Sequence, residues 1–474
     1  MTFQARWQDA VFLVGSCLAA LACGMLIGRG EWIVPAALAA LGGIVLVGLR
    51  GGPELLALLT VAALLQPPLG NIGGIPGMTL SEIVAPILCV TFMARLTHPS
   101  SSLRAIEEPE RTTWELRVVQ AAILAYAAVI GANFLRTKFL LPIVVPGVNR
   151  AFYDYFIALA VFALIYLALT TRGVTFRMLL RIIFSLSLAL CLLGIAAVIL
   201  RLPLNLGSLR YSVVDIASGG VRVGFLETFG TAGLAVVFAA RLRFPLALAA
   251  GLLFAGAIVA SGGRAAAVGV FAAITAYVLI ARRGGVILAI VGVGLIIALF
   301  APQALTTNVQ AARLTDINSR AFYSAGRGLI YRESLHGFRD HALVGTGIGV
   351  PPRFNLSGYQ AFNLNLRRFY AAQFAVGGHA TYAALLKNFG LVGFLPFVVG
   401  LAAALWGLAR LVRETAAAGF FFIFLFAQGV SIFAGGNGSD PVYFFALGGG
   451  AAVLSSRLRH RLPVDDDGKR EVTG

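Results

Sequence analysis

Apolar stretches long enough to cross a bilayer recur along nearly the whole chain. A helix needs about 20 mostly apolar residues to cross a hydrocarbon core of about 30 Å. By that measure we predict about 14 transmembrane helices, over residues 11–27, 32–49, 53–66, 80–95, 116–134, 151–170, 177–200, 223–240, 244–260, 265–281, 285–301, 380–409, 416–434 and 440–456. No soluble domain of ordinary size fits between them. The sequence therefore predicts an all-α polytopic membrane protein with a single transmembrane domain over residues 1–474.

Composition and residue placement exclude several other classes of protein. Hydrophobic residues make up 59% of the chain and charged residues 12%, whereas soluble domains are about half apolar and a quarter charged. The net charge of +17 does not indicate nucleic-acid binding, because the basic residues lie at the ends of the predicted spans. The cysteines lie inside apolar runs, without metal-ligand spacing. We therefore expect no metal and no cofactor; the cysteines are Cys17, Cys23, Cys89 and Cys191.

Two local features refine the predicted topology. The first apolar stretch is too long for a typical signal-peptide core and another span follows almost at once, so we expect an uncleaved first helix. The segment QPPLGNIGGIPG after the third span is rich in glycine and proline. It is expected to be non-helical, and a re-entrant segment is one alternative.

Clusters of arginine assign a side of the membrane to each connection. They occupy alternate connections counted back from the C-terminus, as expected for cytoplasmic ends. With an even number of spans, both termini then face the cytoplasm. The arginines are Arg241, Arg243, Arg282, Arg283, Arg410, Arg413, Arg457, Arg459 and Arg461.

The same assignment places a long basic loop, residues 302–378, on the outer face. It has three acidic residues and eight arginines: Arg313, Arg320, Arg327, Arg332, Arg339, Arg353, Arg367 and Arg368. Basic residues in outward connections indicate an anionic partner there, either phospholipid headgroups or a dedicated phosphate-bearing substrate. Arginine far outnumbers lysine on this face and its planar fork matches phosphate oxygens, which favours the substrate.

Within this loop, the sequence SAGRGLIYRESLHGFRDHALVGTGIGVPPR predicts a helix followed by a turn. Apolar residues recur at helical spacing and arginines leave the apolar face, as expected for a short helix on the membrane surface. The apolar residues are Leu329, Ile330, Leu335 and Phe338, and the arginines are Arg327, Arg332 and Arg339. GTGIG lacks the spacing and the preceding strand of a nucleotide-binding motif, so we expect a tight turn.

His379 is the strongest candidate for acid–base chemistry. It lies at the end of the basic loop and the start of the span in GGHATYAALLKNFGLVG, where a helix N-terminus adds partial positive charge. A capping or packing role is the alternative. His336 and His341 share the loop, but neither lies at a membrane boundary.

Other catalytic chemistries find little support in the outward segments. They contain no GxSxG nucleophile motif and no DxD or clustered acidic residues. A base with several arginines suits transfer of a group whose leaving part is already phosphorylated, since arginine can neutralise a departing pyrophosphate.

The order of these elements resembles that of the O-antigen ligase and O-antigen polymerase family of bacterial envelope enzymes. The resemblance covers residues 220–412 and rests on RVGFLETFGTAGLAVVF, SGGRAAAVGVF, GRGLIYRESLHGFRDHALVGTGIG and HATYAALLKNFGLVGFLPF. It implies a metal-independent inverting glycosyltransferase in the bacterial inner membrane. Such an enzyme moves a glycan from undecaprenyl pyrophosphate to lipid A-core or to another lipid-linked glycan.

The resemblance also implies roles for individual residues. His379 corresponds to the proposed base, Arg222 and Arg327 to arginines that hold the pyrophosphate, and Arg264 to an arginine in a small-residue turn. Arg320 and Arg332 are further candidates for substrate binding. Gly263 precedes the turn arginine where the family often has serine, and Ala380 follows the histidine where it often has asparagine.

Two other classes of function remain open at this stage. A transporter or flippase for a lipid-linked sugar or an organic anion would also have many spans and outward arginines. A scaffold or regulatory membrane protein would explain the spans but not the basic loop. Ligation and polymerisation are not separated by the sequence.

Overall fold

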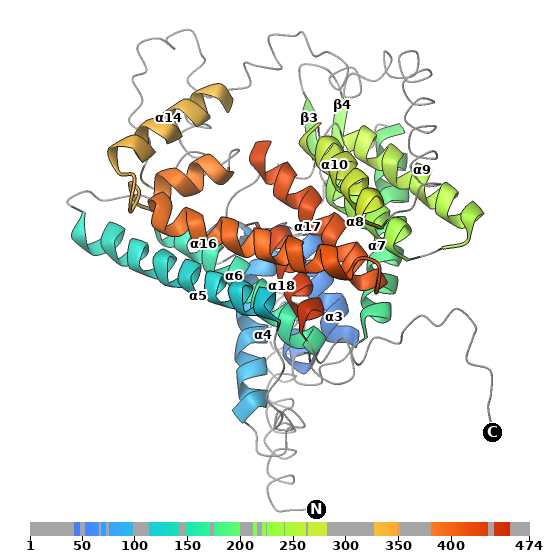
Figure 1. Ribbon diagram of the computed structural model, residues 1–474, viewed down its shortest axis with the longest axis horizontal. Coiled ribbons are helices and arrows are strands. Elements are labelled where there is room, and N and C mark those ends of the chain that lie inside the picture. The colour runs from blue at the N-terminus through green and yellow to red at the C-terminus, as the bar shows by residue number, and fades with distance from the viewer. Residues whose placement is uncertain are drawn as a thin grey trace, which may run out of the picture.

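The computed structural model describes helices, two hairpins and the short segments that adjoin them (Figure 1). The described residues are 42–47, 53–65, 68–72, 75–97, 113–141, 148–170, 175–199, 212–215, 220–223, 225–240, 242–261, 264–281, 327–348, 350, 381–434 and 440–455. The helices are α3 (Pro53–Thr60), η1 (Val61–Leu65), α4 (Leu80–Thr97), α5 (Trp114–Leu135), η3 (Arg136–Leu140), α6 (Val148–Thr170), α7 (Phe176–Ile199), α8 (Phe225–Ala239), α9 (Phe244–Ser261), α10 (Arg264–Ala281), α14 (Arg327–Asp340), α16 (Thr381–Leu411), α17 (Ala416–Ala434) and α18 (Pro441–Leu454).

Among these residues, five helices are long and apolar enough to cross a membrane. They cover Trp114–Leu140, Val148–Thr170, Phe176–Ala196, Phe244–Ser261 and Tyr382–Leu411, and shorter apolar helices accompany them. This indicates a multi-pass membrane protein. The predicted spans 11–27 and 285–301, and all of 32–49 except residues 42–47, lie outside the described residues. The count of about 14 therefore stays a prediction.

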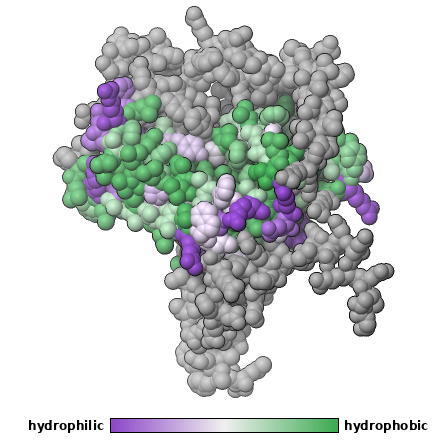
Figure 2. All heavy atoms as spheres, in the orientation of Figure 1, coloured by the Kyte–Doolittle hydropathy of each residue, from purple (hydrophilic) through white to green (hydrophobic). Residues whose placement is uncertain are grey.

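The described part of the face drawn in Figure 2 is largely apolar, as expected of a surface in contact with lipid. Figure 2 shows hydrophobic residues across the middle of one face and hydrophilic residues gathered toward its edges. On α5, Leu124 is 71% exposed, while Tyr126 is fully buried. A helix that is apolar on both its buried and its exposed side is typical of a membrane protein.

The described fold is almost entirely helical, as predicted, and two short antiparallel hairpins accompany the helices. β1 (Pro68–Ile72) pairs with β2 (Ile75–Thr79) within the glycine- and proline-rich segment after η1, so the prediction that this segment is non-helical is confirmed. β3 (Ser212–Asp215) pairs with β4 (Gly220–Val223), and α8 begins two residues later. The predicted span 223–240 thus starts slightly too early.

The core joins helices that are far apart in the sequence. α5 lies along α16, α6 along α18 and α10 along α17 (Figure 1). The buried Tyr126 ring on α5 lies 6.5 Å from that of Tyr155 on α6, 6.0 Å from that of Phe389 on α16 and 6.3 Å from that of Phe444 on α18. Large aromatic side chains at these positions contribute much of the packing energy, because each buries a large apolar area.

Charged and polar residues show that α5 and α16 run antiparallel. At one end, Arg410 near the end of α16 donates to Glu115 at the start of α5 over 2.7 Å. At the other end, Asn133 near the end of α5 donates to the carbonyl of Asn388 near the start of α16 over 3.1 Å. The end with Arg410 is the one that the arginine pattern assigns to the cytoplasm.

The start of α18 offers a small and local stability test. Asp440 is the N-cap, and its carboxylate accepts a hydrogen bond from the Val442 amide over 2.9 Å. Replacing Asp440 with alanine should lower the free energy of unfolding by about 1 kcal/mol, because that amide loses its acceptor. Thermal unfolding in detergent should show the loss for Asp440→Ala, whereas Asp440→Asn keeps an acceptor and should stay close to the parent protein. Equal losses in both variants would contradict the capping role.

Candidate functional site

Two of the predicted arginines lie at, or just before, the starts of the neighbouring helices α8 and α10. Arg222 lies in β4, opposite Val213 in β3, just before α8. Arg264 is the first residue of α10, as the SGGR turn predicted. Both arginines therefore lie where the chain enters an apolar helix.

The other predicted site residues belong to the long loop or to its end. Arg327 is the first residue of α14, and Arg332 lies within that helix. His379 and Arg320 lie outside the described residues; α16 begins at Thr381. The helix predicted in the loop is thus confirmed.

The starts of α8, α10 and α16 meet at one end of the bundle, around the end of α17. Near the start of α16, the Tyr382 hydroxyl donates to the Gly429 carbonyl on α17 over 2.9 Å. The Ser431 hydroxyl, also on α17, donates to the Glu227 carboxylate near the start of α8 over 3.4 Å. On α10, a Cβ placed on Gly269 would lie 2.6 Å from the carbonyl oxygen of Ala427. The elements that carry the predicted residues therefore converge.

A break in α16 attaches α14 to this same end. The predicted span 380–409 is not one continuous helix, because its backbone leaves the helical region at Gly390. We call residues 341–348, which follow α14, the clamp turn. Its Thr346 amide donates to the Lys387 carbonyl over 2.7 Å, and its Ala342 carbonyl accepts from the Leu391 amide over 2.8 Å. Backbone groups released on both sides of the break are thus bonded to the clamp turn.

Glycine is required where these two backbones meet. Gly390 has φ 61° and ψ −160°, a region that side-chain-bearing residues rarely enter. Gly345 in the clamp turn has φ 70°, and a Cβ on it would lie 2.4 Å from the Asn388 carbonyl oxygen. The chain turns over residues 341–344, directly before GTGIG, and Gly345 then fits against the break in α16.

Asn133 ties the clamp turn to α5. Its side chain is buried, donates to the carbonyls of Val344 and Asn388 over 3.2 and 3.1 Å, and accepts from the Ile348 amide over 2.9 Å. Arg136, one turn later, donates to the Gly345 carbonyl over 3.0 Å. α5, the clamp turn and α16 are therefore joined by one hydrogen-bond network.

Lys387 adds a buried cation beneath α14. Only 4% of its surface is exposed, and its ammonium donates to the Val350 carbonyl over 2.6 Å. A Cβ on Gly337 of α14 would lie 3.1 Å from the Lys387 side chain, so the helix passes directly over the lysine. Within the part of the chain that the structure describes, no carboxylate forms an ion pair with Lys387. Lys387 therefore places a basic group at the end of the bundle where α14 packs on α16.

The packing of α14 differs in detail from the predicted amphipathic helix. Ser334 is buried and Gly337 faces Lys387, while Leu335 is 50% exposed. Arg339 is also exposed, as are His336 and His341. Small residues therefore face the bundle, because α14 crosses close to α16, and part of the predicted apolar face stays open to its surroundings.

Sequence reasoning missed Asn133 and the break at Gly390. Burying an asparagine in an apolar span costs free energy unless its amide forms hydrogen bonds. The presence of Asn133 in such a span could therefore have predicted a buried hydrogen-bond site. Glu227 is an acidic residue inside the predicted span 223–240, and the structure gives it Ser431 as a donor. Nothing in the apolar run around Gly390 marks a break.

Metal chemistry has no candidate ligand cluster in the described part of the chain, where no three histidine, cysteine or acidic side chains gather. In the same part, Cys89 and Cys191 form no disulfide. No family model matches the chain, and no curated protein matches it either.

Proposed function

We propose that this protein is an inverting glycosyltransferase of the bacterial inner membrane, with both termini in the cytoplasm. It transfers a glycan from undecaprenyl pyrophosphate to a hydroxyl of a lipid or glycan acceptor, as O-antigen ligases and polymerases do, without a metal cofactor. The observation that supports it is the convergence of the starts of α8, α10 and α16 with α14 at one end of the bundle.

In the proposed reaction, the imidazole of His379 takes the proton of the acceptor hydroxyl. The acceptor oxygen forms a bond to the anomeric carbon while the bond from that carbon to the pyrophosphate oxygen breaks, which inverts the configuration. Undecaprenyl pyrophosphate leaves with the bonding electrons. Arginines stabilise the charge that develops on it, since preorganised donors stabilise a transition state strongly in a water-poor site.

The residues of the proposal divide into two roles. His379 is the base, and the other five bind the substrate: Arg222, Arg264, Arg320, Arg327 and Arg332. The N-termini of α8, α10 and α16 contribute partial positive charge at the same end, where the amino group of Lys387 is also buried. A pyrophosphate is therefore favoured there over a neutral ligand.

One observation favours a second candidate function, a transporter for a lipid-linked sugar or organic anion. α16 is discontinuous at Gly390, and broken helices are frequent in transporters, where half-helix ends bind substrates. Bond cleavage separates the two candidates, since a transporter releases its substrate unchanged.

The test is transfer by purified protein in detergent with EDTA. The donor is an undecaprenyl-pyrophosphate glycan pool, and the acceptors are lipid A-core and lipid-linked glycan in separate reactions. The parent protein should form product. His379→Ala should lower the rate by about 100-fold or more, because a general base contributes that much. Arg327→Ala should lower it by about 100-fold through lost charge stabilisation.

Arg339→Ala is the matched control, since Arg339 belongs to the same helix and is exposed. It should keep turnover within about threefold, as expected for an exposed charge. Each variant must elute as one monodisperse peak. Undiminished turnover by folded His379→Ala would contradict the role of the histidine. Donor binding without any product, together with substrate accumulation in vesicles lacking an acceptor, would favour the transporter.

A further inference from the structure

Large apolar side chains are exposed where the clamp turn meets the end of α5 and η3. We call them the apolar patch, and each is between 49% and 77% exposed: Leu135, Phe139, Leu140, Leu343 and Val344. Arg136 joins the two segments, because its guanidinium donates to the carbonyls of Val344 and Gly345 over 3.3 and 3.0 Å. The patch is therefore one surface made by two distant parts of the chain.

The backbone of the clamp turn is hydrogen-bonded to the protein although it is not helical. The carbonyls of residues 341–345 all accept hydrogen bonds, from the amides of Gly345, Leu391 and Val392 and from the side chains of Asn133 and Arg136. The amides of residues 345–348 donate to the carbonyls of His341, Lys387 and Asn388 and to the Asn133 side chain. Non-helical backbone can lie at membrane depth when protein groups satisfy it in this way.

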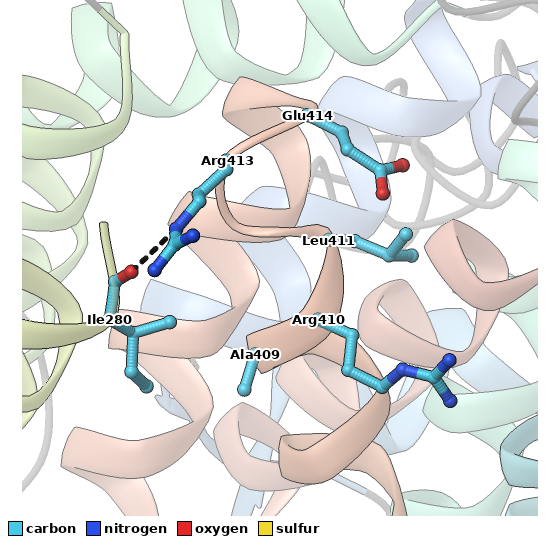
Figure 3. A pocket seen from close by; sticks show the side chains of 6 residues that line it. All are labelled: Ile280, Ala409, Arg410, Leu411, Arg413 and Glu414. Atoms are coloured by element: carbon cyan, nitrogen blue, oxygen red, sulfur yellow. Dashed lines mark hydrogen bonds between the residues drawn. The ribbon is translucent and has the colours of Figure 1, made fainter. Parts of the chain in front are cut away.

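The exposed side chains at the opposite end of α5 and α16 are charged instead. Arg413 and Glu414, which follow α16, are exposed and point away from each other (Figure 3). Arg413 donates to the Ile280 carbonyl on α10 over 2.8 Å, and Arg410 pairs with Glu115 on α5 over 2.7 Å. Such an end suits water or lipid headgroups, whereas an exposed apolar patch indicates an apolar partner.

The length of α5 gives the depth of the apolar patch. The apolar stretch Trp114–Leu140 has 27 residues, which is about 40 Å at about 1.5 Å per residue. A bilayer has a hydrocarbon core of about 30 Å and measures about 40–45 Å with its headgroups. Exposed Trp114 marks one interface. Asn133 lies about 30 Å further along α5, so the clamp turn bonded to it lies where the hydrocarbon of the other leaflet ends. A tilt of α5 would place the turn deeper.

The apolar patch also continues an exposed apolar side of α5. Leu124, near the middle of the span, is 71% exposed. Leu135 follows it by about three turns at about 3.6 residues per turn, so the two side chains leave the helix on the same side. The exposed Lys138 lies beside the patch, with its ammonium 5.4 Å from the Phe134 ring and 5.6 Å from the Phe139 ring. A lysine at the end of a span reaches the headgroups while its stem stays on apolar surface.

We propose that the clamp turn is immersed in the membrane interface and that lipid of the adjoining leaflet covers the apolar patch. The acyl chains contact the patch, and the phosphates lie at the level of Lys138. The partner of this surface is thus a lipid layer and not a soluble protein. This inference is independent of the proposed transfer reaction, because it depends on exposure, backbone bonding and depth alone.

The test measures the depth of a nitroxide spin label by electron paramagnetic resonance. The full-length protein, with Cys17, Cys23, Cys89 and Cys191 replaced by alanine, is reconstituted in vesicles of phosphatidylethanolamine and phosphatidylglycerol. Leu343→Cys carries the label, and Val344→Cys repeats the measurement at the neighbouring position. Relaxation is recorded with oxygen, which concentrates in lipid, and with a water-soluble nickel chelate. Both labels should relax several-fold more with oxygen relative to nickel than a label in water does.

Two labelled control positions bracket the expected result. Leu124→Cys is the lipid control, since its exposed fraction is close to that of Leu343, and Arg339→Cys on the exposed side of α14 is the water control. The labels at 343 and 344 should lie between these two in depth. Nickel access equal to that at Arg339→Cys would place the patch in water and overturn the proposal. Poor access of both reagents would also overturn it, because protein would then cover the patch, either another segment of this chain or a second copy.

Discussion

Replacing Gly390 with alanine is expected to abolish recovery of the folded protein. Gly390 has φ 61° and ψ −160°, where a residue with a side chain is strained by about 1–3 kcal/mol. The added Cβ would also lie 2.3 Å from the Leu343 carbonyl oxygen and 2.6 Å from the Gly345 nitrogen. These are backbone atoms of the clamp turn, so relief of the clash requires breaking its hydrogen bonds to α16.

The measurement is thermal unfolding of the detergent-solubilised protein, followed by size-exclusion chromatography. Gly131→Ala is the matched control, because a Cβ there meets nothing within 4 Å and the residue lies inside α5. That substitution should leave the free energy of unfolding unchanged or raise it by up to about 1 kcal/mol. If Gly390→Ala melts like the parent protein, the break in α16 does not have the geometry described above.

Replacing Asn133 with alanine should cause the second-largest loss of stability. The substitution removes the acceptor of the Ile348 amide and one donor each from the Val344 and Asn388 carbonyls, which keep Arg136 and the Gly347 amide as donors. Each buried group left unsatisfied costs about 1–3 kcal/mol. The expected loss in the free energy of unfolding is about 3 kcal/mol, since some of these groups keep backbone partners.

Gln120→Ala in the same helix is the control for Asn133→Ala. Gln120 is half-buried and donates one hydrogen bond, to the Tyr166 hydroxyl over 3.3 Å. Its loss should cost about 1 kcal/mol. In a urea or SDS titration, Asn133→Ala should unfold at a clearly lower denaturant concentration than Gln120→Ala. Similar midpoints would show that the Asn133 network contributes little to the free energy of unfolding. A drop in transfer activity with Asn133→Ala is also expected, because the network fixes α14 against α16.

The positions of the helices could be predicted from sequence because hydropathy is a local property. Residues 244–260 were predicted as a span, and α9 covers Phe244–Ser261. Residues 177–200 were predicted, and α7 covers Phe176–Ile199. Where a long apolar run ends at arginine, glycine or proline, the end of the helix can be predicted to within a residue or two. The same reasoning found α14 and the turn after it.

The break in α16 and the network around it could not be predicted, because they depend on contacts between distant segments. Asn133 and Asn388 are 255 residues apart in the chain. The residues beside Gly390 are apolar and suit a continuous span, so only the clamp turn shows why the backbone departs from a helix there. The hairpin β3–β4 was also missed, since four-residue strands carry too little periodic signal.

The sequence predicted the order and the starts of the elements that form the candidate site, but it did not predict the buried residues that pack around them. The starts of α10 and α14 at Arg264 and Arg327 agree with the sequence pattern. Buried Lys387 and the Glu227–Ser431 hydrogen bond were not foreseen as parts of one region. The burial of Lys387 arises from packing of α14 on α16, and the Glu227–Ser431 bond from packing of α8 on α17. A sequence without aligned relatives does not reveal these pairings.

The hydrogen bonds of Asn133 also fix an order of events during synthesis. A ribosome adds about 5–20 residues per second, so the segment that ends at Asn388 follows Asn133 by roughly 10–50 s. During that interval α5 has been made, while the groups that will bond its buried amide have not. The end of the bundle that carries the clamp turn therefore closes late, after most of the apolar segments have already left the ribosome.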